Sequence, residues 1–188
     1  MSTASDSDLY PSLVGAGWAG LPAAVRVLHS LTATAPARGV VTVRRGASLL
    51  ARLLGFVLRL PAAGEGIPAE LHVTPRSRGQ RWTRRFAGVP LVTDQAAHDG
   101  ALLEFVGPFA LTFALVAEGG ALVFQQAPSR LGRPGWWIPL PAALGPSITG
   151  RCAGEGGDSA HVTVAIAHPL AGLLVSYDGV FTVPVEAS

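Results

Sequence analysis

The sequence predicts an α+β, β-rich fold: a strongly curved antiparallel sheet of about eight to ten strands, forming a half-barrel or barrel, with two N-terminal helices packed on it. Two observations lead to this prediction. From residue 69 onward, apolar and polar residues alternate with a period of two, as in a half-buried strand. Gly, Pro or Asp residues punctuate this region at near-regular intervals, which is typical of many short strands joined by turns.

The N-terminal part is predicted to be helical. Apolar residues recur at three- and four-residue spacing in 9–31, and Pro22 within this pattern predicts that the helix proper begins near it. A short strand is expected at 40–45. Residues 48–60 then present one broad apolar helical face, with Ser48 as the N-cap.

The rest of the chain is predicted to consist of strands and turns. Leu71 and Val73 alternate with polar residues in the first of these strands. The later predicted strands are 80–87, 101–106, 109–117, 121–126, 134–139, 147–154, 160–167, 172–177 and 180–185. Glu118-Gly119-Gly120 and Asp178-Gly179 predict tight hairpins between the strands that flank them.

Composition indicates a single domain over residues 9–185, preceded by a disordered tail at residues 1–8. The 188 residues are 49% hydrophobic and 14% charged, which is enough to bury a sizeable core. A chain this apolar needs an internal cavity, an oligomer interface or a docking partner to accommodate its apolar side chains. A homo-oligomer is therefore one of the alternatives that the sequence leaves. No stretch approaches the roughly 20 apolar residues of a membrane span. The N-terminus also lacks a signal-peptide pattern, so we expect a cytoplasmic protein.

Residue content excludes several chemistries. The single cysteine, Cys152, rules out an intramolecular disulfide and a multi-cysteine metal site. The absence of lysine excludes Schiff-base chemistry and a P-loop. No histidine or carboxylate motif has metal-ligand spacing. The arginines around Trp82 fall on two strand faces, so we expect no nucleic-acid partner. From the residue content above we also expect no metal and no cofactor.

Strand alternation places two charged residues toward the interior. Trp82, Arg84 and Phe86 share the aromatic face of one strand, and Glu104 lies on a strand that is apolar on both faces. Buried charges need partners, so Arg84 is expected to pair with Glu104 on a neighbouring strand. Two interpretations stay open: a structural ion pair that fixes strand register, or a polar anchor at the base of a ligand pocket.

Five further side chains complete the candidate site. Tyr177 is expected to bury its ring and to find a hydroxyl partner, as a structural residue or a catalytic acid. His29 ends the first helix, where the helix dipole should favour its charged form, as a structural residue or a general base. Trp137, from an adjacent tryptophan pair, is interpreted either as packing or as a stacking wall for an apolar ligand. Phe113 and Phe124 are candidate walls of the same pocket.

Short signatures follow one another in order along roughly residues 9–183. They are Leu13-Val14-Gly15, Trp18, Leu21-Pro22, Val25-Arg26 and His29; Trp82-Thr83-Arg84-Arg85-Phe86; Glu104-Phe105-Val106-Gly107-Pro108; Leu140-Pro141 and Leu144-Gly145-Pro146; and Pro169-Leu170-Ala171-Gly172 with Tyr177-Asp178-Gly179. This string resembles a bacterial family described as domain of unknown function 4166. The resemblance implies a fold unit and no chemistry. Members of that family often form the C-terminal part of saccharopine-dehydrogenase-like or other oxidoreductase-like proteins, so the resemblance implies an oxidoreductase as one candidate partner.

Three functional hypotheses follow. The leading one is binding of a hydrophobic small molecule in an apolar pocket inside the curved sheet, with Arg84, Glu104 and Tyr177 as polar anchors and Trp82 in the wall. The alternative is a cofactor-independent cyclase or isomerase acting on a polyketide-like substrate, with Glu104, Tyr177 and His29 as catalytic residues. A second alternative is a docking module for an oxidoreductase partner, which predicts an exposed apolar patch instead of an enclosed pocket.

Overall fold

The computed structural model describes residues 9–30, 36–77, 79–106, 109–133, 136–141 and 144–184. At positions 129, 131–133, 136 and 137 it describes the backbone only. The predicted tail at residues 1–8 lies outside the described residues.

The first predicted helix is divided into three short helices: α1 (Leu9–Val14), the 3-10 helix η2 (Gly15–Gly20) and α2 (Ala23–Leu28). Gly15 adopts a positive φ of 64°, which ends α1. Pro22 is the N-cap of α2, as its position in the pattern predicted. The second predicted helix is α3 (Leu49–Val57), and the Ser48 hydroxyl caps it by accepting from the Ala51 amide at 3.1 Å.

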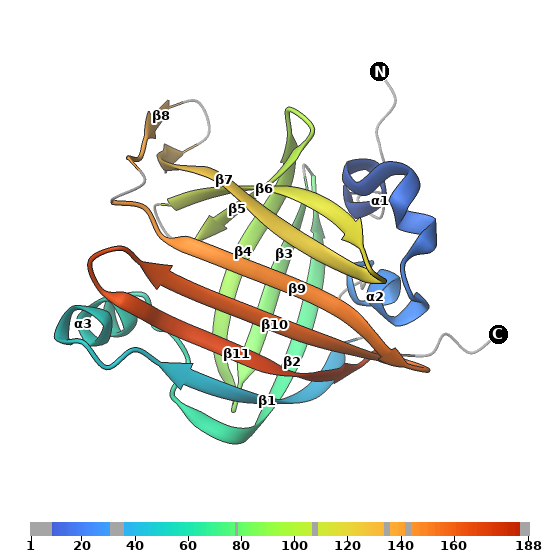
Figure 1. The fold of residues 1–188 in the computed structure, drawn as a ribbon, viewed down its shortest axis with the longest axis horizontal. Helices are drawn as coiled ribbons and strands as arrows, with labels where there is room; N and C mark the ends of the chain where they lie inside the picture. The colour runs from blue at the N-terminus through green and yellow to red at the C-terminus, as the bar shows by residue number, and fades with distance from the viewer. Residues whose placement is uncertain are drawn as a thin grey trace.

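The described strands are antiparallel to their neighbours and follow one another around a barrel (Figure 1). They are β1 (Ala37–Arg45), β2 (Gly64–Arg76), β3 (Gly79–Phe86), β4 (Val89–His98), β5 (Ala101–Val106), β6 (Phe109–Glu118), β7 (Ala121–Arg133), β8 (Trp136–Pro139), β9 (Ser147–Gly156), β10 (Ser159–His168) and β11 (Gly172–Thr182). The order β6-β5-β4-β3-β2-β1-β11-β10-β9-β7 closes on itself because β6 also pairs with β7, while β8 pairs with β7 outside this ring. The predicted α+β, β-rich barrel is therefore confirmed.

One of the two predicted hairpin turns is correct. Gly119 and Gly120 both have positive φ and join β6 to β7. The turn predicted at Asp178-Gly179 is wrong, since β11 runs straight through it. Gly179 serves close packing there: a Cβ atom on it would lie 2.2 Å from the Val40 carbonyl oxygen of β1.

Strand β4 was not predicted from the sequence. Pro90 at its start and the polar residues Asp94 and Gln95 concealed its alternation. In the structure Thr93 and Gln95 are buried on the inner face, whereas Asp94 pairs with Arg81 on the outer face at 2.7 Å. The alternation predicted for β3 is confirmed, with Trp82 and Phe86 buried.

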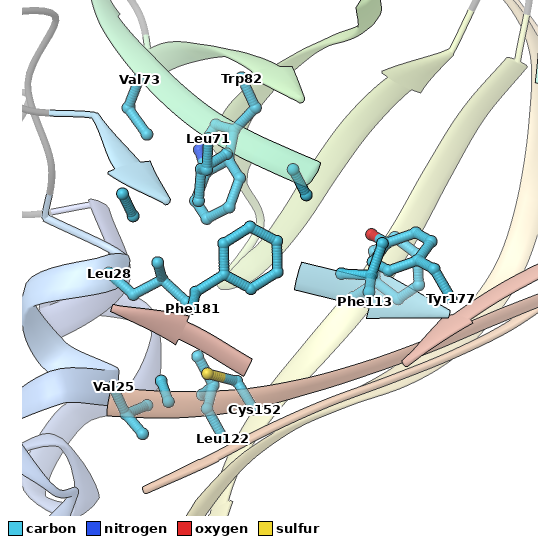
Figure 2. Packing of buried hydrophobic residues seen from close by; sticks show 14 of the residues in the cluster. Val25, Leu28, Leu71, Val73, Trp82, Phe113, Leu122, Cys152, Tyr177 and Phe181 are labelled. Carbon is cyan, nitrogen blue, oxygen red and sulfur yellow. The ribbon is translucent and has the colours of Figure 1, made fainter. Parts of the chain in front are cut away.

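Helices close one end of the barrel, called here the helix-capped end. α1 contacts β6 and β4, and α2 contacts β9 and β10 (Figure 1). Val25 and Leu28 of α2 are buried against the strands (Figure 2). α3 lies at the other end of β10 and β11, where the Ser48 hydroxyl donates to the Ala171 carbonyl at 2.7 Å. We call this the α3 end.

Candidate functional site

The barrel holds a cavity between the helix-capped end and the α3 end. Its volume is about 110 Å³, and every strand of the closed ring except β1 contributes to its lining. Most lining side chains are aliphatic or aromatic. Figure 2 shows several of them, from strands on different sides of the barrel: Leu71, Trp82, Phe113, Cys152, Tyr177 and Phe181.

The predicted site residues are brought together by the fold. All of them except Trp137 line this one cavity: His29, Trp82, Arg84, Glu104, Phe113, Phe124 and Tyr177. Trp137 belongs to β8, and its side chain lies outside the described residues. The geometry thus gathers side chains that are up to 148 positions apart in the sequence, between His29 and Tyr177, around one volume. Their roles toward a ligand stay predictions.

Arg84 and Glu104 form an ion pair at the cavity wall. Arg84 Nη2 donates to Glu104 Oε1 at 3.2 Å, and Arg84 Nη1 donates to Thr93 Oγ1 at 3.0 Å. The two side chains are only 17% and 12% exposed. The expectation that the pair joins neighbouring strands is wrong: β4 lies between β3 and β5, and its Thr93 supports the guanidinium from the strand in between.

The surroundings of Arg84 keep it charged. Burial alone lowers the pKa of the guanidinium, but Tyr177 and Glu104 more than offset this effect, so the net pKa lies above its usual value. The guanidinium carbon also lies 5.0 Å from the centre of the Trp82 ring, in cation–π contact. The positive charge therefore has a carboxylate and an aromatic face within reach inside the barrel.

His29 is neutral, contrary to the expectation from its place at a helix end. Burial, with a smaller contribution from Arg84, lowers the pKa of His29 to about 4. Only 4% of its surface is exposed, and its ring contacts Tyr10 and Trp82 with centroids 4.6 Å and 5.4 Å apart. Nδ1 donates to the Val25 carbonyl at 2.8 Å, which leaves Nε2 as the unprotonated nitrogen.

Tyr177 lines the cavity from β11 with its ring buried, as predicted. The ring packs on Phe86 with centroids 5.1 Å apart. The expected hydroxyl partner is not found: among the described residues no group hydrogen-bonds the Tyr177 hydroxyl. Burial raises the pKa of Tyr177, so the hydroxyl stays protonated and can donate.

Sequence reasoning missed several polar side chains in or beside the cavity lining. Thr93 lies on the unpredicted β4. Above it, Tyr10 donates to Gln95 Oε1 at 2.9 Å, and Gln80 Nε2 donates to the same oxygen at 3.2 Å, which forms a polar layer under α1. Thr93 and Gln95 share the inner face of β4, but the usual alternation of apolar and polar residues gave no signal for them, because both are polar. Tyr10 could not be found locally, because α1 meets β4 only after the barrel closes.

The barrel wall is weakest between β7 and β9. These strands pair only over Ala121–Phe124 and then diverge. Beyond this point the Gln126 side chain of β7 makes the hydrogen bonds to the other side of the seam in place of backbone pairing. Its Nε2 donates to the Pro146 carbonyl at 2.8 Å, and its Oε1 accepts from the Ile148 amide. A surface groove follows the divergence and shares Phe124, Ile148 and Gly150 with the cavity lining. This groove therefore adjoins the cavity at the β7–β9 divergence.

Within the described part of the chain, the cavity lining presents no unpaired buried charge. Arg84 and Glu104 neutralise each other, and Arg151, the third charged lining residue, is exposed. Burial raises the pKa of the Cys152 thiol to about 12, so it is a poor nucleophile near neutral pH. Among the described residues, no three or more His, Cys, Asp or Glu side chains group to hold a metal ion. The arrangement can hold a neutral molecule by shape and a few hydrogen bonds.

Fold and site define a closed antiparallel β-barrel with a helical cap and an internal cavity. The chain belongs to the family described as domain of unknown function (DUF4166), whose sequence model matches residues 21–181. The resemblance drawn from the ordered motifs is thus confirmed. No curated protein and no solved structure matches the chain. In the part of the chain that is described, no helix is long and apolar enough to cross a membrane.

Proposed function

We propose that this protein binds a small, neutral, mainly apolar molecule inside the barrel. One observation carries the proposal: among the described residues, the cavity lining consists mostly of aliphatic and aromatic side chains, and its two buried charges pair with each other. A charged ligand would have to leave water without a counter-ion inside the barrel, which is unfavourable.

Two polar groups would orient the ligand. His29 Nε2 offers an acceptor, since Nδ1 is occupied by the Val25 carbonyl. The Tyr177 hydroxyl offers a donor that no described residue uses. Both groups line the same cavity. A ligand hydroxyl could donate to His29 and accept from Tyr177, so the proposed ligand carries one hydroxyl or a similar group.

The cavity volume limits the ligand to about one ring. A volume of about 110 Å³ is of the order of the roughly 150 Å³ engineered cavity that takes up benzene. A multi-ring, polyketide-like substrate needs more room than this. A histidine with a pKa of about 4 is also a weak base near neutral pH, so the site favours binding over proton abstraction. Docking on an oxidoreductase stays a prediction of the family resemblance.

The test compares three compounds of similar size: benzyl alcohol, toluene and benzoate. Benzyl alcohol is expected to bind most tightly, because it fills the cavity and reaches its polar groups. Toluene should bind more weakly, and benzoate should show no measurable binding, because its charge would be buried without a partner. Titrations followed by ligand-observed NMR, together with the shift of the thermal unfolding midpoint, measure both affinity and stabilisation.

Matched variants assign the binding to the cavity. Val164→Phe fills the lining of β10 and should abolish binding, whereas Val180→Phe places the same ring on the exposed face of β11 and should not. Tyr177→Phe removes only the hydroxyl, so it should weaken benzyl alcohol binding by about fivefold and leave toluene unchanged. The proposal is wrong if folded Val164→Phe binds like the wild type, or if benzoate binds as tightly as benzyl alcohol.

A further inference from the structure

The helix α3 is unusually apolar on its solvent side. Leu49, Leu53, Phe56 and Val57 are between 59% and 83% exposed. Ala51 and Gly55 are its buried residues, so most of its large side chains point away from the barrel. A protein surface rarely keeps so many large apolar side chains together in water without using them in an interaction.

Other exposed apolar side chains lie at the same end of the barrel. Val89 borders the surface hollow beneath α3 together with Phe56. Leu170 precedes Ala171, which accepts the hydrogen bond from the N-cap of α3. The Leu144 carbonyl lies 3.3 Å from His168 Nε2, at the end of β10. Of the large exposed hydrophobic residues in the described ranges, Val40, Val92, Ile138 and Val180 are not part of this group.

The charges of the α3 end are positive. Residues 44–63 contain four arginines and no acidic residue. Arg52 and Arg59 are exposed beside the apolar side chains and border the hollow under α3. The acidic side chains of the turns gather instead at the helix-capped end, where Asp99, Glu118, Glu155 and Asp158 lie next to the β4–β5, β6–β7 and β9–β10 turns. The two ends of the barrel thus differ in both polarity and charge.

We propose that the α3 end docks on a lipid surface that carries anionic headgroups. The apolar side chains of α3 would enter the boundary between headgroups and acyl chains, and Arg52 and Arg59 would reach the lipid phosphates. An exposed apolar face bordered by Arg52 and Arg59 suits this partner, because both its apolar and its charged parts find complements there. The contact is peripheral. It does not depend on the proposed ligand binding, although Leu60, which follows α3, also lines the cavity.

Sedimentation with vesicles tests this inference on the full chain. The wild type should bind vesicles of phosphatidylcholine mixed with phosphatidylglycerol, and bind much less to vesicles of phosphatidylcholine alone. Leu49→Ser with Phe56→Ser should abolish binding to both. Arg52→Gln with Arg59→Gln should weaken binding to the anionic vesicles by about fivefold for each arginine, and added salt should weaken the wild type in the same way.

Control variants separate docking from general stickiness. Val40→Ser with Val180→Ser removes two exposed apolar side chains that face each other on β1 and β11, and it should leave vesicle binding unchanged. Arg76→Gln, at the helix-capped end of β2, should do the same. Circular dichroism checks that each variant is folded.

Two results would overturn the inference. One is a folded wild type that ignores anionic vesicles, or that binds neutral and anionic vesicles equally. The other is a dimer of the wild type, detected by light scattering, that the double variant Leu49→Ser with Phe56→Ser dissociates, while neither form binds vesicles. In that case α3 would contact a second copy of this chain and not a lipid surface.

Discussion

At the scale of single residues, His29 shows how burial can override position along a helix. A helix C-terminus favours a charged histidine by a modest electrostatic interaction. Here the ring is enclosed by aromatic neighbours, and desolvation outweighs that interaction, so the pKa falls to about 4. The positive charge of Arg84, which lines the same cavity, acts in the same direction. The neutral form is therefore the one that the fold selects.

This leads to a prediction for the pH dependence of stability. The unfolded chain binds a proton at His29 near pH 6.5, whereas the folded protein does so only near pH 4. Stability should fall as the pH drops through this window, by about 2 kcal/mol between about pH 7 and about pH 5. Urea denaturation at both pH values measures it. Asp94 and Asp178 have pKa values lowered below 3.8, so their loss of stability comes at more acidic pH.

Two variants isolate the contribution of this histidine. His29→Leu cannot titrate, so its free energy of unfolding should change far less across the same window. His98→Leu removes an exposed histidine and should keep the wild-type pH dependence. Equal slopes for His29→Leu and the wild type would contradict the assignment.

At the scale of elements, the end of α3 closes in an uncommon way. The Leu60 amide donates to the Gly55 carbonyl at 2.9 Å, and the Arg59 amide donates to the Phe56 carbonyl at 3.1 Å. This pair of hydrogen bonds is the Schellman motif, whose left-handed residue is usually glycine. Here Arg59 occupies that position with a φ of 51°. A side chain in this conformation costs stability that glycine would not.

Arg59→Gly should therefore stabilise the protein, against the usual effect of glycine in a folded chain. We expect a gain of about 0.5–1 kcal/mol in the free energy of unfolding, since the relief of strain exceeds the extra entropy of the unfolded chain. Chemical denaturation measures the gain. Arg52→Gly, inside the same helix, is the control and should destabilise by about 1 kcal/mol. A loss of stability in Arg59→Gly would show that its charge or stem matters more than its backbone.

Elements were predictable where one local pattern dominated. The face of β3 that carries Trp82 and Arg84 followed from alternation, and so did most strand positions. β4 escaped because Thr93 and Gln95 put polar side chains on the inner face, where the pattern requires apolar ones. Gly179 was mistaken for a turn residue. Glycine is needed there because the β1 backbone approaches closely, and β1 lies about 140 residues earlier in the sequence. Contacts that depend on closure of the barrel leave no local signal.

At the scale of the whole molecule, closure of the barrel depends on its shortest seam. β7 and β9 share four ladder positions, and Gln126 then holds the diverging strands together through the Pro146 carbonyl and the Ile148 amide. A side chain that makes two hydrogen bonds can substitute for a ladder only as long as both are kept. The seam also borders the cavity, because Phe124 and Ile148 line both the groove and the interior.

Gln126→Leu should therefore loosen this seam selectively. We expect the free energy of unfolding to fall by about 1–2 kcal/mol, because two backbone groups lose their partner. Hydrogen exchange should accelerate at the Ile148 amide and at its neighbours on β9. Exchange of the amides between β1 and β11 should change only as much as the free energy of global unfolding changes. Gln125→Leu, on the exposed face beside it, is the control and should leave the Ile148 amide protected. Acceleration spread evenly over all strands would mean that Gln126 stabilises the barrel as a whole and not the β7–β9 seam in particular. Unchanged exchange at the Ile148 amide would show that the seam holds without this side chain.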